Sequence, residues 1–113
     1  MASNDKLQEM QQLEQTLQML LQQKQQMEME YSETQAALKE LENSGDEVYK
    51  TIGQLLIKSD KTKMQEELKN KEKFLNTRKK SIENQEKSMT EKLNSLRDEV
   101  MKSQNSEKED KKE

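Results

Sequence analysis

Two long heptad patterns, interrupted once, constrain this chain more than any other feature of its sequence. One pattern advances in alternating steps of three and four residues: Met10, Leu13, Leu17, Leu20, Lys24, Met27, Tyr31, Thr34, Leu38 and Leu41. The other repeats every seven residues at Leu68, Leu75, Ile82, Met89 and Leu96. Such spacing is typical of a coiled coil, in which positions a and d of each helix form a narrow buried seam. The segment from Asn43 to Asp60 breaks both patterns and holds both glycines.

The composition favours extended helices over a compact globular core. Of the 113 residues, 28% are hydrophobic and 38% are charged, and only three are aromatic. So little apolar material does not fill an ordinary core. The chain also lacks proline, so nothing forbids long uninterrupted helices.

Capping residues predict where the helices begin and end. The first helix is expected over about residues 5–43, with Asp5 or Ser3 near its start and Gly45 in a left-handed conformation after its end. The second is expected over about residues 60–102, with Asp60 or Thr62 as its N-cap. Residues 103–113 have no apolar side chain and are expected to form a disordered charged tail. Residues 1–102 would then form a single domain.

The two helices are expected to pair with each other in antiparallel orientation. Facing residues would have numbers that add to about 106, which sets Leu38 against Leu68 and Tyr31 against Leu75. The weaker positions of the second seam are assigned to Met64, Lys71, Arg78 and Gln85, followed after a small phase shift by Leu93 and Val100. Lysine and arginine stems can cover a seam while their charges stay in water.

The interruption between the heptads is expected to form a β-hairpin over about residues 47–58. Gly53-Gln54 predicts a tight turn, although an offset of a residue or two between the strands stays open. A lone hairpin is marginal in water, and this one is too apolar to stay bare, so we expect hairpins of several chains to form an intersubunit β-barrel. The alternative is a connector folded onto the base of its own coiled coil. The expected assembly residues are Val48, Tyr49, Ile52, Gly53, Leu55, Leu56 and Ile57.

The helix ends far from the hairpin carry a second candidate site for binding other proteins. Helix ends fray, a two-helix seam covers its residues only partly, and methionine suits adaptable contacts. The candidate residues at these tips are Leu7, Met10, Leu13, Leu96, Val100 and Met101. We expect Met10, Leu96, Val100 and Met101 to be the exposed ones, and Leu13 mainly to complete the seam.

Residue types argue against catalysis, metal binding and nucleic-acid binding. The chain has no cysteine and no histidine, which removes disulfides, thiol nucleophiles, imidazole bases and common zinc sites. The glycine, lysine and serine or threonine pattern of a phosphate-binding loop is absent. The net charge is −3 with both signs interspersed and no basic stripe, and no apolar run is long enough to span a membrane. We therefore expect a cytoplasmic protein that is not an enzyme, with no cofactor, metal, nucleic acid or membrane partner.

The segment EVYKTIGQLLIKSDK, from Glu47 to Lys61, and the following EELKNKEKFLNTRKKSIENQEK resemble the β-type subunit of prefoldin, in its archaeal form most of all. The resemblance covers nearly the whole chain except the polar tail. A single hairpin between the helices fits the β type, because the α type has two. The resemblance implies a hetero-hexamer of two α-type and four β-type subunits, in which the hairpins build a double β-barrel and the coiled coils hang from it.

The resemblance also implies a function. It implies an ATP-independent molecular chaperone, a holdase, that binds unfolded proteins at the coiled-coil tips and delivers them to a group II chaperonin. Val48 to Ile57 would then contribute to the barrel. The alternative is a structural coiled-coil scaffold or tether without chaperone activity, which would dimerise through its heptads and use residues 43–60 as a plain loop.

Overall fold

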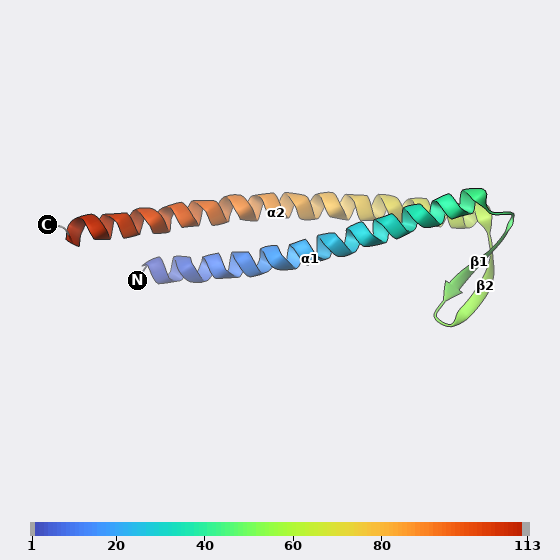
Figure 1. The fold of residues 1–113 in the computed structure, drawn as a ribbon, viewed down its shortest axis with the longest axis horizontal. Coiled ribbons are helices and arrows are strands. Elements are labelled where there is room, and N and C mark those ends of the chain that lie inside the picture. The colour runs from blue at the N-terminus through green and yellow to red at the C-terminus, as the bar shows by residue number, and fades with distance from the viewer. Residues whose placement is uncertain (1, 112–113) are drawn as a thin grey trace. The chain divides into compact units, whose positions relative to one another are not determined.

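The computed structural model describes the backbone of residues 2–111 and the side chains of residues 4–103. Along the chain come helix α1 (Ala2–Asn43), strand β1 (Glu47–Ile52), strand β2 (Leu55–Asp60) and helix α2 (Lys61–Lys111) (Figure 1). This order confirms the predicted mainly α fold, two long helices joined by a β-hairpin. The chain divides into two compact units, which are described separately below: a terminal unit, made of residues up to Lys24 and from Ser81 on, and a hairpin unit, Gln25–Lys80.

The seam predicted for α1 is confirmed in both units. Each of its predicted positions is buried or half-buried, and Leu20, Thr34 and Leu41 are the most deeply buried. Thr34 is tolerated there because its hydroxyl donates a hydrogen bond to the carbonyl oxygen of Glu30 at 2.7 Å, so no polar group is left unsatisfied.

The seam of α2 differs from the prediction at every second position between Leu68 and Met89. Lys71, Arg78 and Gln85 are exposed, and the residues that face α1 there are Glu72, Lys79 and Glu86, each one position further along. With them the alternating steps of four and three continue to Val100, and the predicted phase shift is not needed. The sequence could not decide between the two series, because both consist of long polar residues whose stems can cover a seam.

Ion pairs between the helices confirm the antiparallel register. In the hairpin unit, Lys79 Nζ lies 3.3 Å from Glu28 Oε1. In the terminal unit the pairs are Lys6 with Glu99 at 3.2 Å, Lys92 with Glu9 at 3.3 Å, and Arg97 with Glu14 at 3.2 Å. In each pair the two residue numbers add to within about five of 106, as expected for facing positions of antiparallel helices.

Helix α1 begins earlier than predicted and ends without the predicted glycine cap. It starts at Ala2, so Asp5 lies in the first turn, where a carboxylate interacts favourably with the helix dipole. Gly45 does not adopt a positive φ, so its assignment as a left-handed cap is wrong. Instead, the backbone N–H and the hydroxyl of Ser44 both donate to the carbonyl oxygen of Leu41, at 3.2 and 2.9 Å. Ser44 thus satisfies the carbonyl oxygen of Leu41 in the last turn, and no residue in a left-handed conformation is required.

Helix α2 begins where one of the two predicted caps places it. The Asp60 side chain accepts a hydrogen bond from the backbone N–H of Thr62 at 3.3 Å, which makes Asp60 the N-cap. Next to it, the Lys61 ammonium donates to the carbonyl oxygen of Ser44 at 2.8 Å and joins the adjacent ends of α1 and α2. A lysine there also offsets the partial negative charge at the end of α1.

At its other end, α2 continues to Lys111, past residue 102, where a disordered tail was expected. Residues 103–111 contain neither glycine nor proline and are rich in glutamate and lysine, so no residue stops the helix. Positions 112–113 of the predicted tail lie outside the described residues. Over residues 2–111, neither helix has an apolar stretch long enough to cross a membrane.

Candidate functional site

The hairpin has the register that its sequence predicts. Strands β1 and β2 pair in antiparallel fashion, from Glu47 opposite Asp60 to Ile52 opposite Leu55, so Gly53 and Gln54 form a two-residue turn with no offset. Gly53 has a φ of 60°, and no other type of residue in the described chain has a positive φ. That combination is typical of a type II′ turn, which requires glycine at its first position and matches the twist of the two strands.

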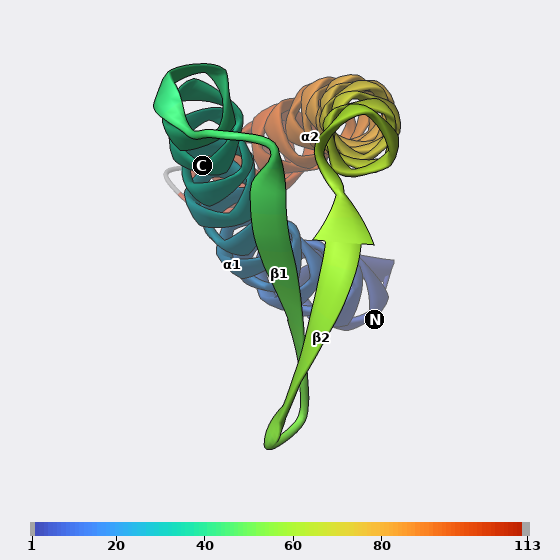
Figure 2. The same cartoon turned by 90° about the vertical axis from the view of Figure 1, so that its right-hand side faces the viewer.

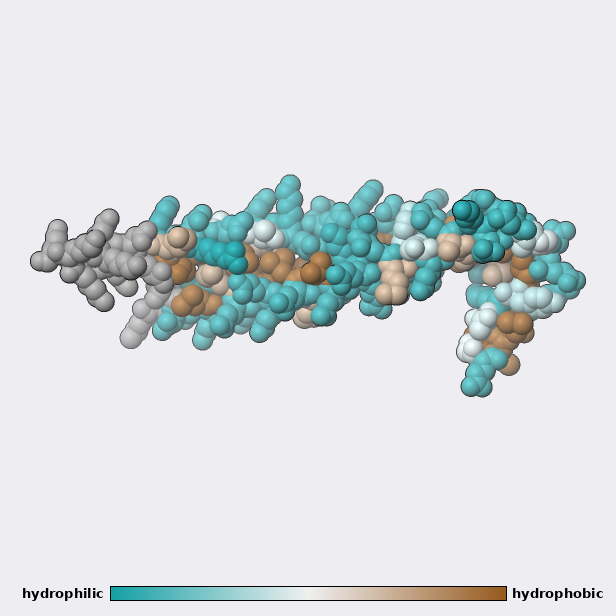
Figure 3. Space-filling model, viewed as in Figure 1, coloured by the Kyte–Doolittle hydropathy of each residue, from teal (hydrophilic) through white to brown (hydrophobic). Residues whose placement is uncertain are grey.

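The two faces of the hairpin differ in apolar content. The register places Val48, Ile52, Leu55 and Ile57 on one face, which we call the aliphatic face although Lys50 and Ser59 also lie on it near the base of the hairpin. Tyr49 and Leu56 lie on the opposite face among polar and charged neighbours. Figure 3 shows hydrophobic side chains gathered on the hairpin.

Most of the aliphatic face is bare. Only Val48, at the base of the hairpin, is buried, with 7% of its surface exposed, whereas Leu55 is 66% exposed and Leu56 on the other face 69%. Tyr49, Ile52, Gly53 and Ile57 are exposed as well. The alternative of a connector folded onto the coiled coil is therefore wrong. Within the hairpin unit, Figure 2 shows the strands extending away from the helix ends.

A salt bridge fixes the base of the hairpin to α2. Lys50 Nζ lies 3.1 Å from Glu67 Oε2, and both side chains are about half exposed. This contact ties β1 to α2. The remaining residues of the hairpin project without support from their own helices.

The terminal unit separates the predicted tip residues into two groups. Leu96 and Val100 are buried, so the expectation that they are exposed is wrong: they are consecutive seam positions of α2. Met10, which was also expected to be exposed, is half-buried in the seam of α1, as is Leu13. Leu7 and Met101 are exposed, Met101 by 61%.

Within the terminal unit, the structure also exposes two apolar residues of α1 that the sequence reasoning missed, Met19 and Leu21. The signal was available, because both residues lie outside the predicted seam positions. A leucine or methionine outside the a and d positions of a two-helix coiled coil has no partner helix to cover it.

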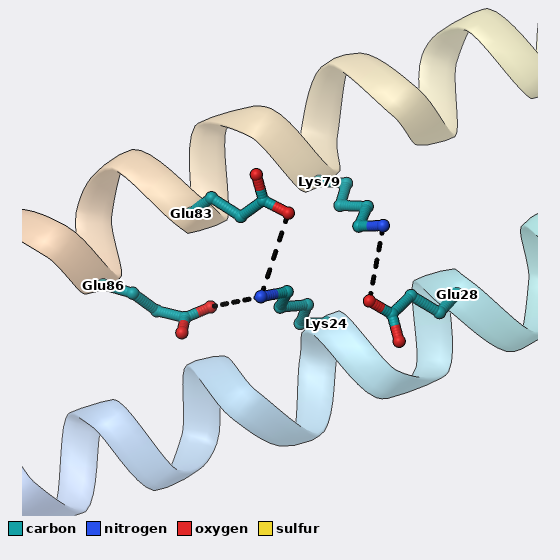
Figure 4. A network of polar contacts seen from close by, with 5 residues as sticks. All are labelled: Lys24, Glu28, Lys79, Glu83 and Glu86. Carbon is teal, nitrogen blue, oxygen red and sulfur yellow. Dashed lines mark ion pairs between the residues drawn. The ribbon is translucent and has the colours of Figure 1, made fainter.

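A polar cluster lies in the seam of the terminal unit (Figure 4). Lys24 Nζ lies 3.8 Å from Glu83 Oε1 and 3.9 Å from Glu86 Oε1. The Glu86 oxygen is buried and has no hydrogen-bond partner, which is unfavourable for a carboxylate. No three His, Cys, Asp or Glu side chains within the described range are placed to hold a metal ion. The cluster contributes to helix pairing, where a buried polar contact favours one register over others.

Comparisons with known proteins agree with this architecture. Residues 4–107 match the model of the family described as "Prefoldin subunit". Prefoldin subunit beta of Thermococcus onnurineus is 45% identical over 85 residues, covering 74% of this chain and 73% of that protein. The beta subunit of Methanothrix thermoacetophila is 39% identical over 101 residues, covering 88% and 84%.

The same relationship appears in three dimensions. The crystal structure of the prefoldin beta subunit from Thermococcus strain KS-1 matches with a TM-score of 0.81 at 36% identity, covering 90% of this chain and 91% of that one. The likeness thus includes both helices and the hairpin between them. The chain therefore belongs to the prefoldin family of chaperones, as a subunit of the beta type.

Proposed function

We propose that this chain is a subunit of an ATP-independent holdase, which assembles through its hairpin and binds unfolded proteins through the exposed apolar residues of its terminal unit. The observation that carries the proposal is the bare aliphatic face of the hairpin. Full burial of a side chain such as Ile52, Leu55 or Ile57 contributes about 1.5 to 3 kcal/mol. In a single chain these side chains stay exposed to water and do not contribute this free energy. A second hairpin packed against this one would bury them.

The proposed assembly is a hetero-hexamer of two α-type and four β-type prefoldin subunits. Each strand of an isolated hairpin has an edge of unpaired backbone groups, which pair with further strands when a sheet closes between chains. A closed barrel of hairpins would satisfy these edges and cover the aliphatic face at the same time. Neighbouring subunits, rather than the chain itself, would supply the missing partners.

The proposed client surface comprises Leu7 and Met101, the two tip candidates that are exposed. Clients would be unfolded proteins, which display apolar side chains and are held by adaptable, non-directional contacts. The chain has no phosphate-binding loop, so holding would require no nucleotide. The holdase would then deliver its client to a group II chaperonin in the cytoplasm.

Two measurements on the complex isolated from its own cells test this proposal. The native mass is expected near six chains of 13.4 kDa, about 80 kDa, with a second type of coiled-coil subunit in the minority. Introducing Ile52→Lys with Leu55→Lys should leave small species, whereas Lys58→Gln, on the opposite face of the hairpin, should not. An unchanged mass for the first variant would exclude the hairpin as the assembly element.

The second measurement is the aggregation of a chemically denatured protein without nucleotide. The intact complex is expected to suppress it, and Leu7→Ser with Met101→Ser should raise the concentration needed several-fold at unchanged native mass. Met29→Ser, which replaces an equally exposed methionine in the hairpin unit, is the matched control. Equal holding by both variants would remove the assignment of the tips, and no holding by the unchanged complex would favour a structural scaffold.

A further inference from the structure

The hairpin is attached to its two helices in different ways. Residues 44–46 connect α1 to β1, and a Cβ added at Gly45 would meet no atom within 4 Å. On the other side, β2 ends at Asp60 and α2 begins at Lys61, so the strand passes directly into the helix (Figure 2). The direction of the hairpin is therefore determined mainly at its junction with α2.

One polar contact joins a strand to a helix at a distance from this junction. Lys50 Nζ of β1 lies 3.1 Å from Glu67 Oε2 of α2. The cap at Asp60 and the hydrogen bond of Lys61 lie at the junction itself. Among the described side chains, no other ion pair or hydrogen bond links the hairpin to either helix.

The ion pair between Lys50 and Glu67 closes a triangle with one corner at Asp60. Lys50 lies opposite Ile57, three positions before Asp60, so one side of the triangle is about 10 Å of strand. Glu67 lies seven positions after Asp60, so the second side is about 10 Å of helix. The ion pair is the third side. Since three sides of given length determine a triangle, the ion pair determines the angle between β2 and α2.

Buried Val48 is less well placed to determine this angle. It lies opposite Ser59, next to the junction, and is 7% exposed. A contact there acts about 3 Å from the corner of the triangle, compared with about 10 Å for Lys50, and resists rotation correspondingly less. Further out, Ile52 and Leu55 are exposed. The ion pair is therefore the contact best placed to hold the hairpin at one angle.

We propose that Lys50 and Glu67 are positioning residues, which set the angle between the hairpin and α2 and thereby the direction in which the helix pair leaves the assembled hairpins. The inference rests on the proposed function, in which neighbouring subunits hold each hairpin in a sheet. With the hairpin held, a change of angle at the junction turns the helices instead. The ion pair then determines how much space neighbouring helix pairs enclose for a client.

The contact is expected to favour one angle without excluding others. Both side chains are about half exposed, and an exposed ion pair shifts an equilibrium by up to about fivefold. Breaking it should therefore leave the hairpin and the complex intact while other angles become populated.

Two spin labels within the hairpin unit of the full chain test this contact. The chain has no cysteine, so Gln54→Cys at the turn and Lys73→Cys on α2 supply the only attachment points. Pulsed electron spin resonance, with the labelled chain diluted into unlabelled chain, gives the distribution of distances between the labels. Lys50→Glu and Glu67→Lys each leave two like charges facing, and each should lower the ratio of the main distance to all others about fivefold. The two substitutions together should restore it.

The matched control is Glu28→Lys, which reverses one member of the Lys79–Glu28 ion pair at 3.3 Å in the same unit. That pair joins α1 to α2 and does not involve the hairpin, so the label distances should not change. The proposal is overturned if both reversed variants keep the distribution of the unchanged chain, if the double variant does not restore it, or if the control alters it equally.

Small-angle X-ray scattering of the assembled complex tests the consequence for the helix pairs. At unchanged native mass, complexes with Lys50→Glu or Glu67→Lys should show a broader distribution of interatomic distances, and the complex with both should match the unchanged one. Identical scattering from all of them would overturn the proposal, because neighbouring subunits would then set the direction. A native mass lost with Glu67→Lys, which leaves the hairpin unaltered, would assign the pair to assembly and overturn it too. If the unchanged chain forms no complex, the proposed function fails, while the label distances still decide whether the pair sets the angle.

Discussion

Within the hairpin unit, the two helices bury the leucines of their seam, whereas the hairpin leaves its own leucines exposed to solvent. Leu75 of α2 is 3% exposed, whereas Leu55 of β2, the same residue type, is 66% exposed. The helix pair satisfies its backbone internally and covers its seam with a partner from the same chain. A hairpin of two strands does neither of these. Each strand keeps one edge of unpaired backbone groups, and the two faces of the hairpin still need to be covered. The comparison shows that the helix pair covers its apolar residues within one chain, whereas the hairpin leaves most of its apolar residues exposed, which is the basis of the proposed assembly.

The largest expected effect comes from truncating the two leucines in turn. Leu75→Ala should lower the free energy of unfolding of the dilute chain by about 2 to 4 kcal/mol, because it leaves a cavity in the seam. Leu55→Ala should lower it by less than about 0.5 kcal/mol in the dilute chain, because its side chain is already in water. Urea unfolding followed by circular dichroism gives both values. Equal losses would contradict the distinction between a complete and an incomplete element.

A smaller effect, of opposite sign, is expected where the helix pair itself is polar. Lys24→Leu with Glu86→Leu replaces a half-buried charged contact by an apolar one and should stabilise the chain by about 1 kcal/mol. Either substitution alone should be less favourable than the double one, because it leaves the other charge in the seam. The urea midpoints of the three variants, measured at equal protein concentration, decide this. A double variant less stable than the unchanged chain would show that the polar cluster is itself stabilising.

The smallest effect is expected at the turn. Gly53→Ala places a Cβ at a φ of 60° and should destabilise the hairpin by about 1 kcal/mol, although nothing lies near the added atom. Gly45→Ala is the matched control, since Gly45 has equal space and no positive φ. Amide hydrogen exchange of β1 should be about fivefold faster in the first variant and unchanged in the second. Equal exchange in both would show that the turn does not limit hairpin stability.

The features that could be predicted from the sequence are those that neighbouring residues along the chain determine. The seam of α1, the turn at Gly53 and the cap at Asp60 each depend on residues whose preferences agree with the fold. Glu72, Lys79 and Glu86 were missed because hydropathy does not distinguish them from the preceding Lys71, Arg78 and Gln85, and only their packing against α1 does. The burial of Leu96 and Val100 was missed for another reason: both were assigned to the seam, but the helix ends were expected to fray and expose them.

Charge segregation escaped the sequence reasoning for a different reason. Residues 25–43 include five glutamates and one lysine, and residues 61–80 include eight lysines or arginines and three glutamates, so each segment's excess could have been counted from the sequence. It was missed because only the overall balance, which is close to neutral, was considered. What the structure adds is that the two segments lie beside each other in the hairpin unit.

The antiparallel register also governs the order in which the chain folds. Ser44 and Lys61, which join the helix ends next to the hairpin, are 17 residues apart, whereas Glu14 and Arg97 are 83 apart. Closing the larger loop from an unfolded chain is less favourable by about 1.4 kcal/mol, so contacts between the helices should form from the hairpin outward. During synthesis, every residue of α1 is joined to the chain before any residue of α2 exists. Until α2 is made, the apolar seam of α1 has no partner. A member of a chaperone family therefore exposes, during its own synthesis, the kind of apolar surface that chaperones bind.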